Sequence, residues 1–283
     1  MKASNMKQAW KRLRTALLFT VWSLAAVLAV LQAGALHQTY AQVHWTPDYE
    51  KVDILPLLQK AERTQEDYAV LYAQTGLTHL GIEDLLEVHD IHRILEIQTH
   101  YFEEYTVETD LFAPFTSTQT IDGRGVYGRL HNGDLIISSS AFFSWFRCGH
   151  AAMMVDAPAQ QIINAVSIGA DSVLEPLSEF ESRANFMVLR PRLPTELRES
   201  VASYAKSWLV GLPYQLTAGL LTDKFESPVT STQCAHLVWY AYQMFGVDLD
   251  SNGGRLVTPK DLAQSPLVEL VQTFGFDPQR LWS

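Results

Sequence analysis

A cysteine and a histidine carry the most reactive side chains of this sequence. Cys234 stands at the expected start of a helix, where free backbone N–H groups and the helix dipole favour a thiolate. His150 follows Gly149 at the start of an apolar run that predicts a strand. A thiol beside an imidazole base is the reactive pair of a cysteine hydrolase. The other interpretation is a cysteine packed in the core, and these residues alone leave both open.

A third residue is expected to orient the imidazole. Asn164 is the polar member of a second apolar run, 161–166, and a hairpin between this run and 150–155 would bring it beside His150. A buried asparagine needs hydrogen-bond partners, and an imidazole N–H is a suitable one. The alternative is an asparagine at a strand edge that faces water.

Other thiols and imidazoles fit the chemistry less well. His236 lies two residues after Cys234, which puts it on a different side of the helix and makes it a poor base. Cys148 is either a buried free thiol or a redox partner of Cys234. His89, His92 and His100 are more typical of solvated or core residues than of metal ligands, so neither a metal nor a cofactor is expected.

An α+β fold is predicted around these residues. Apolar residues recur at helical spacing from Ile54 to Leu95, and Gly76 divides this region into two or three helices. From about Tyr101 the pattern changes to β, with a hairpin turn at 122–123. The other expected elements are strands at 135–137, 151–155, 161–166 and 185–190, a helix at 195–209, a Cys234 helix capped by Ser231 or Thr232 and ending near Gly246, and short helices and turns at 259–282.

The N-terminus is typical of a targeting or anchoring segment. A basic start of five lysines and arginines precedes the almost entirely apolar stretch 16–36. That stretch is about long enough to span a bilayer, while 33–35 offers small residues for signal cleavage. Either way the body of the protein is expected to be exported. It therefore lies at the cell membrane if the segment is an anchor, or is secreted or periplasmic if the segment is cleaved.

The charge and cysteine content exclude some classes of protein. Without the basic start the chain has 16 basic residues against 31 acidic ones, which argues against nucleic acid or anionic lipid as the main partner. Two cysteines are too few for a disulfide scaffold. The oligomeric state is not indicated.

Three separated motifs together resemble a known family. The stretches 133–137, 149–153 and 234–242, in this order, are similar to the circularly permuted NlpC-type papain-fold hydrolases of the YiiX/YebB-like group. In ordinary NlpC-type enzymes the cysteine helix precedes the histidine strand, whereas here the histidine comes first. The similarity covers roughly residues 130–260.

The resemblance implies a role for each matching residue. Cys234 matches the nucleophile, His150 the base and Asn164 the polar third member, where many relatives have Glu or His. Tyr214 matches the tyrosine of a Gly-x-Pro-Tyr stretch that lines the substrate site, and Asp134 matches a Gly-Asp pair that hints at a role in supporting the site.

The sequence thus predicts a membrane anchor or signal at 1–36, a linker and helical region at 37–108, and a permuted papain-like domain at 109–283, with an antiparallel sheet packed on the cysteine helix. The expected function is hydrolysis of an amide in a cell-wall peptide, through a Cys-His-Asn triad. The alternatives are a lipid acyltransferase or thioesterase, and a binding protein that retains the fold without catalysis. The aromatic residues at 142–146 are expected either to pack in the core or to form an apolar rim for an acyl chain or membrane.

Overall fold

A computed structural model describes residues 2–113 and 116–282, in two compact units. The first unit comprises the chain up to Gln42 together with Ser144–Phe146. Its main element is the long helix α1 (Lys2–Tyr40), in which Trp10–Gly34 is long and apolar enough to cross a membrane, with a mean hydropathy of 2.1. The predicted N-terminal apolar segment is confirmed as a helix compatible with an anchor or a signal sequence.

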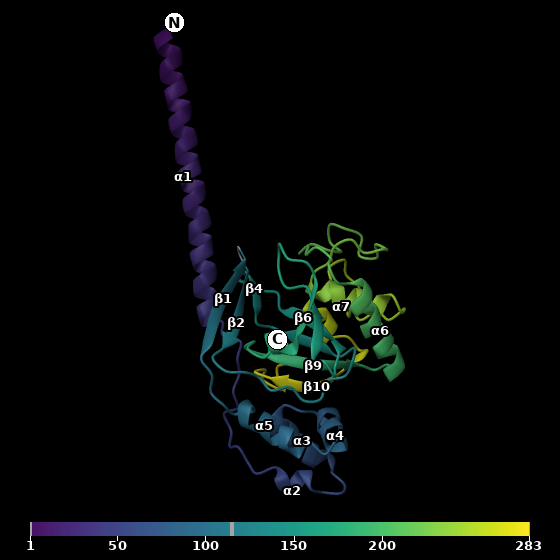
Figure 1. The fold of residues 1–283 in the computed structure, drawn as a ribbon. Coiled ribbons are helices and arrows are strands. Elements are labelled where there is room, and N and C mark those ends of the chain that lie inside the picture. Colours follow the sequence, from purple (N-terminus) through teal and green to yellow (C-terminus); the bar gives the residue numbers. More distant parts are fainter. Residues whose placement is uncertain (1, 114–115, 283) are drawn as a thin grey trace. The chain divides into compact units, whose positions relative to one another are not determined.

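The second unit is built on a six-stranded antiparallel sheet (Figure 1). Its strand order is β10-β9-β3-β6-β7-β8. Alternate residues of the central strands enter two different apolar clusters, one on each face, so the sheet is buried on both sides. The strands are β3 (Leu135–Ser138), β6 (His150–Asp156), β7 (Gln161–Asn164), β8 (Val173–Pro176), β9 (Phe186–Pro191) and β10 (Val268–Phe274).

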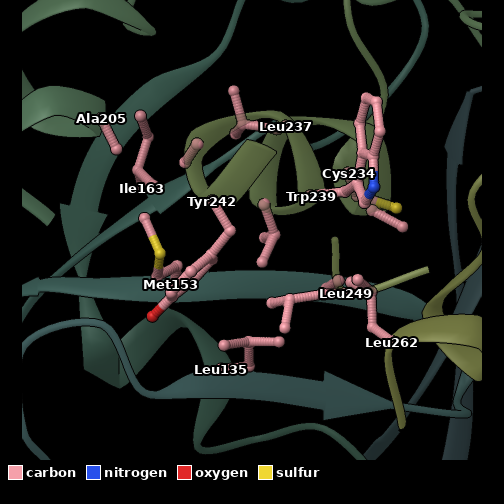
Figure 2. Close-up of a cluster of buried hydrophobic side chains, with 14 of the residues drawn as sticks. Leu135, Met153, Ile163, Ala205, Cys234, Leu237, Trp239, Tyr242, Leu249 and Leu262 are labelled. Carbon is pink, nitrogen blue, oxygen red and sulfur yellow. The ribbon is translucent and has the colours of Figure 1, made fainter. Parts of the chain in front are cut away.

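Two helices cover one face of this sheet. Figure 2 shows the cluster in which α6 (Thr195–Trp208) and α7 (Cys234–Gln243) meet the side chains of Leu135 and Met153. Every residue of α7 from Cys234 to Tyr242 is buried. Such a helix is held by apolar burial on all sides, which contributes about 1.5–3 kcal/mol for each large side chain. The first residue of this buried helix is the candidate nucleophile.

Four short helices pack together beside the strand β10. They are α2 (Leu55–Leu58), α3 (Gln65–Thr75), α4 (His79–Glu87) and α5 (Ile91–Tyr101), and they share an apolar cluster with Val126. Gly76 ends α3 in the left-handed conformation, and the Thr78 N–H then donates to Val271 O at 2.9 Å. The helical region and the sheet therefore belong to one compact unit.

The remaining elements are short. A small antiparallel sheet places β2 (Thr116–Ile121) between β1 (Val107–Ala113) and β4 (Ala141–Phe143). The other elements are β5 (Phe146–Arg147), the 3-10 helix η1 (Leu177–Phe180) and α8 (Pro259–Ala263).

The structure confirms the α+β class and the four predicted strands, and it corrects three expectations. The tail contains a strand, β10, that sequence reasoning took for helices and turns; its residues alternate only weakly in polarity. Asp122-Gly123 forms no hairpin, because Asp122 closes the ladder against Thr106 and the chain then runs to β3 as a loop. His89 lies in the left-handed region between α4 and α5, rather than on a helix with His92.

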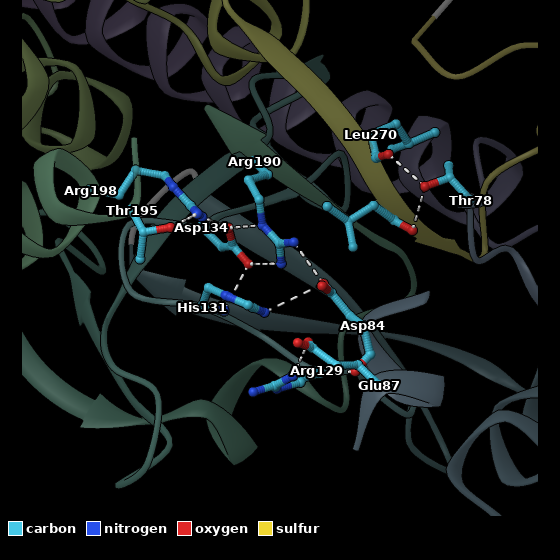
Figure 3. Close-up of polar contacts among 11 residues, drawn as sticks. Thr78, Asp84, Glu87, Arg129, His131, Asp134, Arg190, Thr195, Arg198 and Leu270 are labelled. Carbon is cyan, nitrogen blue, oxygen red and sulfur yellow. Dashed lines mark hydrogen bonds and ion pairs between the residues drawn. The ribbon is translucent and has the colours of Figure 1, made fainter. Parts of the chain in front are cut away.

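A buried polar cluster joins the helices to the sheet (Figure 3). The Asp134 carboxylate accepts hydrogen bonds from Arg190 Nε at 2.9 Å and Nη2 at 2.8 Å, and Arg190 Nη1 reaches Asp84 of α4 at 2.6 Å. Arg198 forms a further ion pair with Asp134 at 3.5 Å. Asp134 lies directly before the first residue of β3. Ser138, the residue that pairs with His150, lies at the opposite end of this strand. Asp134 thus links the sheet to α4 through Arg190, and the hint that it supports the candidate site stays a prediction.

Candidate functional site

His150 and Asn164 meet as the sequence predicts. His150 Nε2 and Asn164 Oδ1 are 2.7 Å apart, and both side chains are buried. Gly149 directs the chain into β6 with a φ of +69°, and a Cβ at this position would lie 2.9 Å from Ser138 O. The register places Asn164 opposite Ala152, on the same strand face as His150 two residues earlier.

A carboxylate that sequence reasoning missed fixes the orientation of this pair. Asn164 Nδ2 donates to Glu175 Oε1 at 2.6 Å, so Oδ1 must point toward His150. A carbonyl oxygen only accepts, so His150 carries its proton on Nε2 and leaves Nδ1 as the basic nitrogen. Burial raises the pKa of Glu175. The only available signal was that Glu175 is an acidic residue in the strand next to Asn164.

Cys234 begins α7 beside the first residues of β6. The backbone N–H groups of Ala151 and Ala235 lower the pKa of its thiol, but burial raises it more strongly, so the net direction is upward. The sequence-based expectation of a lowered pKa is thus wrong for this state, since only 5 % of the residue is exposed. The thiol donates to Gln233 Oε1 at 3.4 Å. No hydrogen bond between Cys234 and His150 is present among the described residues.

The cap of the cysteine helix is Gln233, rather than Ser231 or Thr232. Its Oε1 accepts from the Ala235 N–H at 2.8 Å, while its Nε2 donates to Val257 O at 2.6 Å. The side chain is thereby held at both ends. A glutamine is an uncommon cap, so the usual preference for serine and threonine pointed one or two residues too early.

Burial also sets the protonation state of the base. Burial is the largest cause that lowers the pKa of His150, and the charge of Arg183 lowers this pKa further. The hydrogen bond with Asn164 acts in the opposite direction, but the pKa stays well below 6.5. At neutral pH the site therefore holds a neutral thiol and a neutral imidazole. This pair can act by general-base catalysis, in which the proton moves only as the thiol attacks.

A small pocket opens beside His150. It encloses about 50 Å³, and its lining includes Cys148, His150, Arg183 and Tyr214. Cys234 is not among the lining residues. Burial is the main cause that raises the pKa of the Tyr214 phenol, and the charge of a thiolate at Cys234 adds to it. Tyr214 therefore lies where the sequence placed it, at the rim of the candidate site.

Arg183 is the second residue that sequence reasoning missed. It is buried, and its guanidinium lies 4.2 Å from the ring centroid of Phe180. The Phe180 ring in turn packs 5.5 Å from the His150 ring. No motif marked this arginine, because it lies in the segment between η1 and β9, outside the three stretches that carry the family resemblance.

Of the weaker candidates, Cys148 lines the pocket beside His150, whereas His236 is not among its described lining residues. His236 contacts Thr232 Oγ1 and Lys224 O, both at 3.1 Å. Cys148 and Cys234 are both free thiols, and burial raises the pKa of Cys148 to about 12. No cluster of three potential metal ligands occurs in the described part of the chain.

The aromatic stretch before His150 divides between two environments. Phe142 is buried and lines the pocket, whereas Trp145 and Phe146 are largely exposed. Core packing is thus confirmed for Phe142, and the apolar rim for an acyl chain or membrane stays a prediction.

Comparison of this chain with protein-family models, with curated proteins and with solved structures gives no match. The case for a function therefore depends on the geometry described above.

Proposed function

We propose that this protein is an exported, membrane-anchored or secreted cysteine hydrolase that cleaves an amide in a peptide of the cell envelope. The observation that carries the proposal is the 2.7 Å contact between His150 Nε2 and Asn164 Oδ1, with the Cys234 thiol at the helix start against the backbone N–H of Ala151, the residue after His150. This contact leaves Nδ1 of His150 unprotonated on the strand that packs against α7. The sheet packed on the cysteine helix also supports the permuted papain-like fold that the motif order suggests.

The reaction follows the steps of nucleophilic catalysis. The Cys234 thiol leaves its contact with Gln233, His150 Nδ1 takes its proton, and Sγ bonds to the carbonyl carbon. His150 then returns this proton to the departing amine as the C–N bond breaks, which leaves a thioester. Water, deprotonated by His150, attacks the thioester and regenerates the thiol. The backbone N–H of Cys234, in the first turn of α7, is a candidate donor to the oxyanion.

The lipid-directed alternative is supported by one observation. Phe142 and Phe143 line the pocket, and Trp145 and Phe146 of the same stretch are exposed, a composition suited to an acyl chain. The non-catalytic alternative is supported by the buried, protonated state of Cys234. Substrate preference separates the two enzymes, and thiol reactivity separates both from a binding protein.

The test uses the full-length protein in detergent with two matched variants. Cys148→Ala leaves only Cys234, and Cys234→Ala leaves only Cys148. We expect iodoacetamide near pH 7 to label Cys234 faster than Cys148, because the proposed mechanism assigns His150 as the base of Cys234 and the start of α7 favours its thiolate. In a screen of peptide amides against short-chain esters and phospholipids, Cys148→Ala should retain turnover and Cys234→Ala should have none.

Two outcomes would count against the proposal. Equal labelling of the two cysteines with no turnover of any substrate would favour a binding protein. Turnover of esters or phospholipid alone would favour the lipid enzyme.

A further inference from the structure

Arg183 is the only buried arginine in the described residues that has no ion pair. Only 6 % of the residue is exposed, and its Nε and Nη1 atoms are buried without a hydrogen-bond partner in the described part of the chain. The other two buried arginines, Arg190 and Arg198, both pair with Asp134. A buried guanidinium without an anion is costly, because desolvation of the charge is not offset.

The acidic residue that acts on the charge of Arg183 is already hydrogen-bonded elsewhere. Glu175 affects the charge of Arg183 from a distance, but its Oε1 accepts the short hydrogen bond from Asn164. No Asp or Glu is among the described residues that line the pocket, and His150 is neutral near pH 7. The described lining therefore carries a net positive charge at Arg183, in a protein whose overall charge is −10.

The position of the guanidinium relates it to the reactive groups. Phe180 packs against Arg183 on one side and against His150 on the other, so the aromatic ring fixes both side chains. Arg183 and His150 line the same pocket of about 50 Å³. A space of this size accepts a few non-hydrogen atoms, because one water-sized sphere needs about 10–15 Å³.

We infer that Arg183 binds a carboxylate of the substrate close to the carbonyl that Cys234 attacks, so that the substrate is an acidic peptide. This inference rests on the proposed function and names its substrate class. A planar carboxylate matches the planar guanidinium and its single charge, and it fits a pocket of a few atoms. A tetrahedral phosphate with ester groups on both sides needs more room.

Binding without turnover tests the inference. The full-length Cys234→Ala variant in detergent is titrated calorimetrically with N-acetyl-alanyl-glutamate and with its uncharged counterpart N-acetyl-alanyl-glutamine amide. We expect the acid to bind about 10- to 100-fold more tightly, as for a hydrogen-bonded charge pair. Arg183→Gln in the same background should abolish this difference, and Arg183→Lys should keep part of it.

Equal affinities for the acid and the amide in the protein that retains Arg183 would overturn the inference. This comparison does not depend on whether an Arg183 variant folds. Arg183-dependent binding of a short-chain phospholipid, with none of the acidic peptide, would also overturn it in favour of a phosphate. A third outcome is that wild-type protein hydrolyses no substrate, while the acid still binds through Arg183. In that case the proposed hydrolase function fails and the carboxylate site stands.

Discussion

Two buried arginines of this protein have opposite surroundings. Arg190 lies between two carboxylates, with Asp134 at 2.8 Å and Asp84 at 2.6 Å (Figure 3). Arg183 is equally buried but lines a pocket, with its guanidinium 4.2 Å from the ring centroid of Phe180. The charge of Arg190 is neutralised by ion pairs within the protein, whereas Arg183 has no ion pair in the described residues.

The pKa directions express the same difference. The carboxylates raise the pKa of Arg190, while burial lowers that of Arg183 to about 10. Even so lowered, Arg183 stays protonated near pH 7. The comparison teaches that this protein supplies carboxylate partners to a buried arginine, Arg190, that joins the helices to the sheet. The buried arginine without such partners, Arg183, lies beside the candidate base. Perturbed groups of this kind are typical of functional sites.

The largest expected effect is on stability, from a variant that disrupts the buried polar cluster around Asp134. Arg190→Met leaves the buried Asp134 carboxylate with the His131 N–H at 2.8 Å and the longer Arg198 contact as its remaining partners among those described, so the free energy of unfolding should fall by about 3–5 kcal/mol. Chemical denaturation of the full-length protein in detergent measures this loss. Turnover per folded molecule should stay unchanged, because Asp134 lies at the far end of β3 from the residue that pairs with His150. A stable but inactive variant would show that the cluster serves the site after all.

A smaller effect on rate is expected from the orienting residue. Asn164→Ala removes the acceptor that fixes the His150 tautomer, so kcat should fall about 10- to 100-fold while KM changes less. Steady-state kinetics on the best amide substrate measures both constants. Glu175→Gln is the matched variant, since it keeps a group at Asn164 Nδ2 but no longer requires Oδ1 to face His150. If Asn164→Ala changes KM alone, Asn164 contacts substrate and does not orient the base.

The sequence predicted the dyad of this site but missed the charges around it. His150 and Asn164 lie in one hairpin, so period-two alternation and a short turn were enough to bring them together. Glu175 and Arg183 reach the same place from β8 and from the segment after η1, and only the packed tertiary structure brings them there. The same reason hid β10, whose pairing with β9 joins residues about 80 positions apart.

The sign of the thiol shift was missed for a related reason. A helix start does lower the pKa of Cys234, but the prediction left out the burial of every side chain around it. Local sequence shows the dipole, whereas the amount of desolvation depends on how α7 packs in the whole fold.

The depressed pKa of His150 predicts a pH effect on stability. Below about pH 6.5 the unfolded chain takes up a proton at this residue while the folded protein does not, so stability falls as pH falls. One such group contributes at most about 1.4 kcal/mol per pH unit. His44 and His236 also have lowered pKa values, so the measurement compares wild type with His150→Asn between pH 6.5 and 5. We expect the wild type to lose stability more steeply; equal slopes would mean that His150 is charged in the folded protein.

The smallest expected effect returns to the unpaired arginine. Arg183→Met removes a buried charge that has no ion pair and replaces it with an apolar side chain that can still pack on Phe180. The lost cation–π contact and the relieved desolvation oppose each other, so the free energy of unfolding should change by less than about 1 kcal/mol. Chemical denaturation of Arg183→Met and Arg190→Met under the same conditions compares the two losses of stability directly. A loss of several kcal/mol at both positions would show that Arg183 is satisfied within the fold, which would remove the reason to assign it a ligand.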